Sequence, residues 1–316
     1  MSYLATLWKR YAPECVSVAL LVLVLVITAM REPRFFDTEY LFDRSTLYME
    51  TGLLTLAMTL VIIAGHIDLS VTSILALVGA IIATLHVRFG APLGVLLPLA
   101  PVLGAGLGWI NGVLVAKRKL PSLVVTLATM ALYRGVAQIL LGDQSLPMPR
   151  WFVGIEKVSL PGTYFHAPLL LLLAAAVGFG LLLHRTVFGR YITTVGVNSE
   201  AAQYSGVPAE KVLTRIFVLS GATAGVAALL LLSRLGVARY DHARGLELDV
   251  ITAVVLGGTS IYGGRGTIFG SLAALLLIAT LQTGMGVSGV TAETQVTAIG
   301  VLLILALLLA KITHRT

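Results

Sequence analysis

The residues best suited to contact a polar ligand lie inside otherwise apolar stretches of the sequence. Within residues 122–141, four polar side chains recur at helical spacing and would line one face of a helix: Ser122, Thr126, Thr129 and Tyr133. Arg134 and Gln138 form an adjacent pair four residues apart. Hydroxyl groups, an amide and an aromatic ring suit a polyol substrate, but the same groups also form hydrogen bonds between membrane helices. Both interpretations stay open, and Arg134 could instead extend toward the membrane surface.

Asp68 interrupts a second apolar region, in the segment AGHIDLSV at residues 64–71. A carboxylate that faces lipid at the centre of a helix costs about 2.5–3.5 kcal/mol, so a role inside the protein is expected. It could cap the next helix by accepting hydrogen bonds from the N–H groups of Ser70 and Val71. It could instead contact a substrate or ion, or pair with Arg134. We predict that Asn111 lines a substrate pathway together with Asp68 and the polar residues of 122–141.

A glycine-rich run, GGTSIYGGRG at residues 257–266, superficially resembles a phosphate-binding loop. It lacks the lysine of such loops, and GxxxxGK[ST] occurs nowhere in the chain, so ATP binding by a P-loop is not expected. We predict a turn in a broken or re-entrant membrane helix, which is tolerated where protein surrounds the backbone. Its structural glycines would be Gly257, Gly258, Gly263, Gly264 and Gly266.

Other reactive groups form no recognisable site in the sequence. The six histidines show no i, i+4 pair and no HExxH, so neither a metal nor any other cofactor is expected on this chain. The single cysteine, Cys15, excludes an intramolecular disulfide and a cysteine zinc cluster. There is no GxSxG and no carboxylate pair within an expected span. The sequence therefore predicts that the chain is not an enzyme.

The composition is that of a polytopic membrane protein. Of 316 residues, 57% are hydrophobic and 12% are charged, about half the charged share of soluble domains. Apolar stretches predict an all-α bundle of about ten transmembrane helices, some short or broken, forming a single domain over 1–316. The expected spans are 15–30, 51–65, 69–86, 92–116, 121–141, 167–184, 212–233, 248–262, 266–285 and 294–312.

The charges between these spans predict the orientation. Ten crossings place both termini on one side, which would carry twelve basic and four acidic residues. The opposite side would carry nine basic and eleven acidic residues. Because basic residues mark the cytoplasmic face, both termini are expected in the cytoplasm. The net charge of +7 is thereby explained without nucleic acid as a partner.

A long polar segment, 184–215, separates two of the spans. Its centre reads as a short helix with Asn198 or Ser199 as the N-cap and Glu200 in the first turn. Pro208 marks a point by which this helix must have ended. A short helix presented on the cytoplasmic side predicts a mechanical coupling point for a partner protein, within a loop at 185–211.

Small residues recur at GxxxG spacing in two of the spans. Gly104, Gly108 and Gly112 lie in one of them, and Gly221 and Gly225 lie in the other. This spacing lets helix backbones approach closely in lipid. Packing inside the bundle is the preferred interpretation, with a subunit interface as the alternative.

Several of these segments together resemble a known family. Residues 64–71 resemble the GGIDLSVG signature of the sugar-type ATP-binding-cassette (ABC) importer permeases, the ribose-permease family. Residues 121–130 and 133–135 resemble its PxFIxTLGTM and YRG segments. Residues 195–207 resemble its G-x-NxxAAxxSGI stretch, and residues 254–267 resemble VLGGTSxxGGRGS. His66 and Thr72 stand where this family usually has glycine.

The resemblance implies a permease subunit in the bacterial cytoplasmic (inner) membrane that transports a sugar or sugar-like molecule by alternating access. The segments 202–205 and 233–239 resemble the rhamnose and autoinducer-2 branches more than the ribose branch. Separate cytoplasmic ATPases, which carry ATP and Mg, would dock on the coupling residues Asn198, Glu200, Ala201, Ala202, Ser205 and Gly206. The other implied partners are a second permease subunit, identical or related, and a periplasmic or lipid-anchored binding protein.

Two other transporter classes remain as alternatives. An ion-coupled secondary transporter would use its own ion-coupling residues, usually several intramembrane carboxylates or interrupted helices near the midplane, and only Asp68 is a candidate. A branched-chain amino-acid permease of the same importer superfamily would differ only in its substrate. The GxIDLSV and GGTSxxGG patterns favour a sugar.

Overall fold

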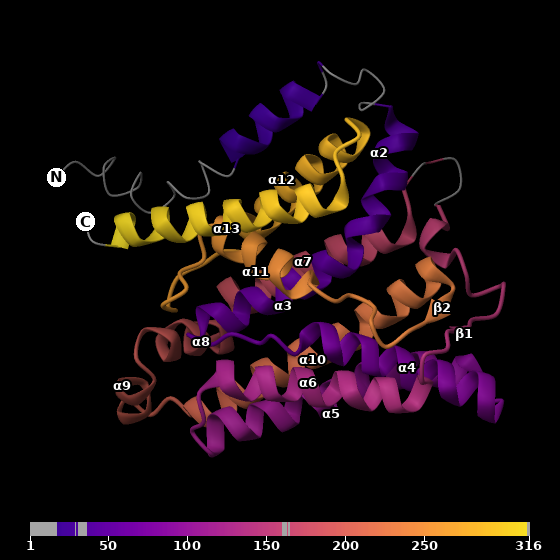
Figure 1. Ribbon diagram of the computed structural model, residues 1–316. Coiled ribbons are helices and arrows are strands. Elements are labelled where there is room, and N and C mark those ends of the chain that lie inside the picture. The colour runs from indigo at the N-terminus through magenta and orange to yellow at the C-terminus, as the bar shows by residue number, and fades with distance from the viewer. Residues whose placement is uncertain (1–17, 29, 31–36, 160–162, 164, 315–316) are drawn as a thin grey trace.

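The computed structural model describes residues 18–28, 30, 37–159, 163 and 165–314 (Figure 1). Within the predicted span 15–30, the described part is a helix over Val18–Thr28. Lys9, Arg10 and Cys15 lie outside the described residues, as does Arg315. These basic residues therefore enter the predicted orientation through the sequence alone.

Helices make up most of the described chain, as the sequence predicts. In chain order the elements are α2 (Thr38–Ser45), η2 (Thr46–Tyr48), α3 (Met49–Ile63), α4 (Val71–Phe89), α5 (Leu93–Gly112), η3 (Val113–Lys117), α6 (Ser122–Leu141), β1 (Leu146–Pro147), η4 (Ile155–Lys157), α7 (Ala167–Arg185), α8 (Val187–Val197), α9 (Ser199–Tyr204), α10 (Ala209–Leu235), β2 (Val237–Ala238), α11 (Leu246–Leu256), α12 (Ile268–Val287) and α13 (Ala292–His314).

Seven of the described helical segments are long and apolar enough to cross a membrane, so the predicted count of ten is not confirmed. The predicted span 248–262 is wrong in extent, because α11 ends at Leu256. Gly258 follows with a φ of +87°, a conformation that does not continue a helix. At 11 residues α11 is about 16 Å long, roughly half the hydrocarbon thickness of a bilayer.

The core surrounds α3, in which every residue is buried. α3 packs against α7, α10, α11 and α12. α5, α6 and α7 bury only one face each and expose apolar side chains on the other, such as Val124 (62% exposed) and Ile139 (84% exposed). Such outward apolar faces are what a lipid-facing or subunit-facing surface needs, since water would not solvate them.

Two connections without helix join helices of the bundle, one largely buried and one with exposed residues. Figure 1 shows the segment that follows α3 passing from beside α8 to the start of α4, and the segment after β2 passing inward to the start of α11. These segments are 64–70 and 236–245. We call the two ends of the bundle the α9 end, which holds α8 and α9, and the hairpin end, which holds β1 and β2.

The GxxxG spacing serves packing within the chain. Gly108 lies so close to α10 that an added Cβ would overlap the carbonyl of Phe217, and Gly104 and Gly221 meet in the same way. α5 and α10 therefore touch backbone to backbone along their lengths, as small residues permit in membranes. This confirms the preferred interpretation of the spacing.

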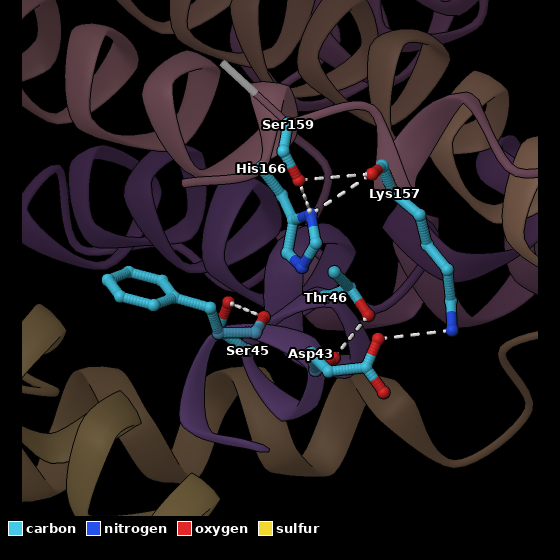
Figure 2. Close-up of polar contacts among 7 residues, drawn as sticks. Asp43, Ser45, Thr46, Lys157, Ser159 and His166 are labelled. Atoms are coloured by element: carbon cyan, nitrogen blue, oxygen red, sulfur yellow. Dashed lines mark hydrogen bonds and ion pairs between the residues drawn. The ribbon is translucent and has the colours of Figure 1, made fainter. Parts of the chain in front are cut away.

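Polar contacts tie α2 to the connection between α6 and α7 at the hairpin end (Figure 2). The ammonium of Lys157 lies 3.1 Å from a carboxylate oxygen of Asp43, and both side chains are about half exposed. Close by, the hydroxyl of Ser159 lies 3.0 Å from the ring nitrogen Nδ1 of His166. β1 pairs with β2 in antiparallel register, with Leu146 opposite Ala238. These contacts hold the long connection against the bundle.

Candidate functional site

The predicted coupling helix is present as α9 at one end of the bundle (Figure 1). Asn198 is its N-cap, and the side-chain oxygen of Asn198 accepts a 2.9 Å hydrogen bond from the Ala201 N–H. The carbonyl of Ala201 in turn accepts a hydrogen bond from the hydroxyl of Ser205. Gly206 closes the helix with a φ of +83°, which favours glycine.

α9 presents its polar side to solvent and one small residue to the bundle. Ala202 is 1% exposed, whereas Tyr204 is 86% exposed and Glu200 is also exposed. Gln203 and residues 206–211 border an open groove of about 260 Å³ next to Tyr204 in the chain. An exposed tyrosine beside a groove is a surface that a partner protein could cover, because aromatic side chains supply contact area at protein interfaces.

The predicted glycine turn lies between α11 and α12 and folds back on itself. Gly258, Gly263 and Gly264 have positive φ. Gly257 lies against the backbone of Gly270, in the first turn of α12, and Gly266 lies against the side chain of Thr259. The turn is held by hydrogen bonds within it, including one of 2.9 Å from the Ser260 N–H to the Arg265 carbonyl.

Asp68 is fully buried at the end of the 64–70 connection. One carboxylate oxygen accepts hydrogen bonds from the N–H of Ser70 at 3.0 Å and from its hydroxyl at 2.6 Å. The other oxygen accepts one at 3.1 Å from the hydroxyl of Ser220 on α10. The Asn111 amide of α5 completes the cluster by donating to the Ser70 hydroxyl at 2.7 Å. The predicted hydrogen bond from the Ser70 N–H is present, but Ser70 precedes the first residue of α4 and no side chain caps this helix. Ser220 adds a contact that the sequence did not indicate.

The polar stripe of α6 faces the bundle rather than lipid. Thr126, Thr129 and Tyr133 are all buried. The hydroxyl of Thr126 donates to the carbonyl of Ile67 at 3.2 Å, and the hydroxyl of Tyr133 donates to the carbonyl of Leu107 on α5 at 3.0 Å. These contacts match the interpretation of interhelical hydrogen bonding. A role of the stripe in the substrate pathway stays a prediction.

The remaining members of the predicted pathway lie further along α6. Arg134 does not pair with Asp68, because one terminal nitrogen of its guanidinium donates to the carbonyls of Tyr240 and His242 at 2.7 and 2.6 Å. Arg134 thereby holds the 236–245 connection against α6. Gln138 is exposed. The structure thus groups Asp68, Asn111 and Thr126 and places Arg134 and Gln138 apart from them.

Three further carboxylates on helices of the bundle were not among the sequence candidates. Glu50 of α3 is 2% exposed and forms an ion pair with Arg234 of α10 at 3.0 Å. Glu247 accepts a 2.8 Å hydrogen bond from the hydroxyl of Thr72, and so joins the first turns of α11 and α4. Asp249 is hydrogen bonded to Gln282 on α12. Glu50 and Glu247 directly precede the predicted spans 51–65 and 248–262, and Asp249 stands at the start of the second. The predicted orientation counts all three on the outer side.

The 236–245 connection carries an ion pair of its own. Two guanidinium nitrogens of Arg239 donate to the Asp241 carboxylate at 2.8 and 2.7 Å. These hydrogen bonds lower the pKa of Asp241 to about 2, so the pair is ionised at neutral pH. Among the described residues, no group of three histidine, cysteine or acidic side chains could hold a metal ion.

Two comparisons with known proteins each match most of the chain. Residues 40–307 match the family model described as the permease component of branched-chain amino acid transport systems. The autoinducer 2 import system permease protein LsrD of Salmonella typhimurium (strain LT2) is 34% identical, covering 94% of this chain and 91% of the relative. LsrD of Yersinia enterocolitica is 33% identical, covering 98% of this chain and 95% of the relative. No solved structure matches the chain.

Proposed function

This chain belongs to the family of permease components of branched-chain amino acid transport systems, and from that membership we propose how it works and what it carries. It is the permease component of an ABC importer, a multi-pass protein of the bacterial inner membrane. We propose that its substrate is autoinducer 2 or a sugar-like molecule of that class, such as ribose or rhamnose.

Similarity along the whole chain carries the substrate proposal. The relatives named as autoinducer 2 permeases are 33–34% identical over more than nine tenths of both chains. The description of the family favours a second candidate, a branched-chain amino acid. The two differ chemically, because autoinducer 2 is a polyol-like molecule and leucine is a zwitterion with an apolar side chain. Competition between such ligands therefore separates the two candidates.

The exposed α9 supports a docking role for the coupling residues. Glu200 and Tyr204 project from a helix that only Ala202 anchors to the bundle. ATPase subunits that carry ATP and Mg would dock there, and this chain would contribute no cofactor site. The α9 end would then face the cytoplasm, and both termini with it, in agreement with the excess of basic residues expected on that side.

The outward apolar faces of α5 and α6 support pairing with a second permease subunit, either a copy or a relative. A binding protein would deliver the substrate at the hairpin end. Movement of the ATPases would push on α9 and shift the helices between outward-open and inward-open states. This chain would thus transmit force and form the substrate pathway, and it would carry out no covalent chemistry.

Uptake by cells tests the substrate. The chain is expressed with its native ATPase and binding protein in bacteria that lack their own importers for these ligands. We expect uptake of labelled autoinducer 2 that excess ribose or rhamnose reduces more than excess leucine does. Uptake of leucine alone would instead establish the amino-acid candidate.

Recovery of partners tests the docking role of α9. The tagged protein is extracted from its native membrane in detergent, and co-purifying proteins are identified by mass spectrometry. We expect a P-loop ATPase, and we expect its recovery to fall when Glu200→Arg and Tyr204→Asp are combined. Phe89, 74% exposed at the end of α4, supplies the control Phe89→Asp, which should leave the ATPase bound. Equal recovery with both variants would contradict docking on α9.

A further inference from the structure

Three stretches of backbone cross beside α8 without intervening side chains. Gly196, in the last turn of α8, lies against the carbonyl of Ile63, the last residue of α3, and against the amide of Gly264. The Gly264 N–H donates a 2.7 Å hydrogen bond to that same carbonyl. We call Ile63, Gly65, Gly196, Gly263 and Gly264 the glycine junction.

The contacts of Gly196 and Gly263 are with backbone atoms, so they cannot relax by a change of side-chain rotamer. A Cβ on Gly196 would overlap the Ile63 carbonyl and stand 2.7 Å from the Gly264 nitrogen. A Cβ on Gly263 would stand 3.0 Å from the backbone of Gly65, and both of these glycines have positive φ. Because the contacts are between backbones, a displacement of the end of α8 must displace the other two segments or break the junction.

One branch leads from the junction into the interior along the 64–70 connection. Two residues after Gly65, the N–H of Ile67 donates to the hydroxyl of Ser122, and its carbonyl accepts from Thr126, so the connection is tied to α6. Asp68 then ties it to Ser220 of α10. The 64–70 connection therefore joins the junction to the start of α4 and is held along its length by hydrogen bonds.

The second branch leads through α11. The turn that contains Gly263 and Gly264 ends this helix, where Gly257 lies against the backbone of α12. At the other end of α11, Glu247 accepts the hydrogen bond from Thr72 in the first turn of α4. α11 is thus a rod of about 16 Å between the junction and the start of α4, which the first branch also reaches.

We propose that the glycine junction is where movement of α8 and α9 enters the bundle, and that α11 carries this movement as a rigid rod to the Glu247–Thr72 contact. The inference rests on the proposed function, in which ATPases move α9. It goes further by naming the residues through which that movement passes. Gly196 is a positioning residue in this scheme, since it touches neither ATP nor substrate.

The test uses the complete importer in lipid vesicles, with substrate uptake and ATP hydrolysis measured on the same sample. Gly196→Ala should lower the substrate moved per ATP hydrolysed at least about tenfold while hydrolysis continues. Gly178 of α7 has open space where a Cβ would stand, so Gly178→Ala is the matched control and should keep the ratio. Unchanged coupling in an assembled Gly196→Ala complex would overturn the proposal.

If Gly196→Ala does not assemble, a measurement on the wild-type complex tests whether the junction moves together with α9. Hydrogen exchange is compared with and without a non-hydrolysable ATP analogue. We expect protection to change together in residues 63–68, 196–204 and 257–266. A change in α9 with none in the other two segments would refute the link. Failure of the proposed function looks different, because the wild-type vesicles themselves would then show no ATP-driven uptake.

Discussion

The α5–α10 contact and the glycine junction are both built from glycine, yet they join different kinds of segment. Gly104, Gly108 and Gly221 lie in the middle of long helices, whose backbone hydrogen bonds are already made within each helix. Gly65 and Gly263 lie in turns between helices and have positive φ. The first contact therefore joins two rods that must stay together, whereas the second joins ends that can rotate about their dihedral angles.

The difference indicates which part of the molecule is frame and which part moves. α3 and α10 belong to the frame, because α10 packs on both α3 and α5 and the Glu50–Arg234 ion pair joins it to α3. The moving part would be α8, α9, α11 and the non-helical connections. Substitutions in the frame should lower stability, and substitutions in the moving part should lower coupling.

The largest effect is expected for Gly108→Leu. Even a Cβ at this position would overlap the Phe217 carbonyl, so a leucine would force α5 and α10 apart. We expect no folded protein in detergent, measured by recovery after size-exclusion chromatography. Gly106, on the same helix, has open space around it, and Gly106→Leu should be recovered like the wild type. Normal recovery of Gly108→Leu would show that folding does not depend on the α5–α10 contact, contrary to its place in the frame.

The next effect is a loss of stability from Glu50→Gln. This change leaves the guanidinium of Arg234 without its carboxylate. We expect a cost of about 3 kcal/mol, the lower end for a broken buried pair, because the Arg234 side chain is 23% exposed. Thermal unfolding in detergent measures it as a lower melting temperature. A melting temperature equal to the wild type would show that the pair does not stabilise the frame.

A smaller effect, on transport rather than stability, is expected for Thr72→Val. Valine keeps the shape of threonine but removes the hydrogen bond to Glu247, so uptake per ATP should fall by up to about tenfold. Thr84 lies on the same helix and is buried, and its hydroxyl has no partner among the described residues. Thr84→Val is the control. Equal uptake per ATP by the two variants would show that the Thr72–Glu247 contact carries no movement from α11 to α4.

The smallest effect is expected for Asp43→Asn at the hairpin end. The ion pair of Asp43 with Lys157, visible in Figure 2, is about half exposed and should contribute less than about 1 kcal/mol. We expect melting temperature and uptake close to the wild type. A large loss of uptake with normal stability would instead place this pair in the binding-protein interface.

Local rules predicted the α9 end from the sequence. The N-cap and extent of α9 depend on residues within one turn, so the sequence could narrow the N-cap to Asn198 or Ser199 and place the end of the helix before Pro208. The stripe of α6 follows from helical spacing alone, and the structure buries it as that spacing suggests. Whether it also lines a pathway depends on partner chains that its spacing does not describe.

Contacts between distant segments could not be predicted in this way. Glu50 and Arg234 are 184 residues apart, and Thr72 and Glu247 are 175 residues apart, so no local pattern joins them. Hydropathy likewise extended α11 past Leu256, because a glycine turn inside a bundle is as apolar as the helix before it. The glycine junction depends on three such segments meeting, which spacing in one segment does not reveal.

The ratio of substrate moved to ATP hydrolysed, compared between Gly196→Ala and Gly112→Ala, tests the division into frame and moving part most directly. Gly112 belongs to the α5–α10 contact, where an added Cβ would stand 2.9 Å from the Cα of Thr214. We predict that Gly112→Ala lowers the amount of assembled complex but keeps its ratio, and that Gly196→Ala lowers the ratio. An equal ratio in the two variants would contradict the account.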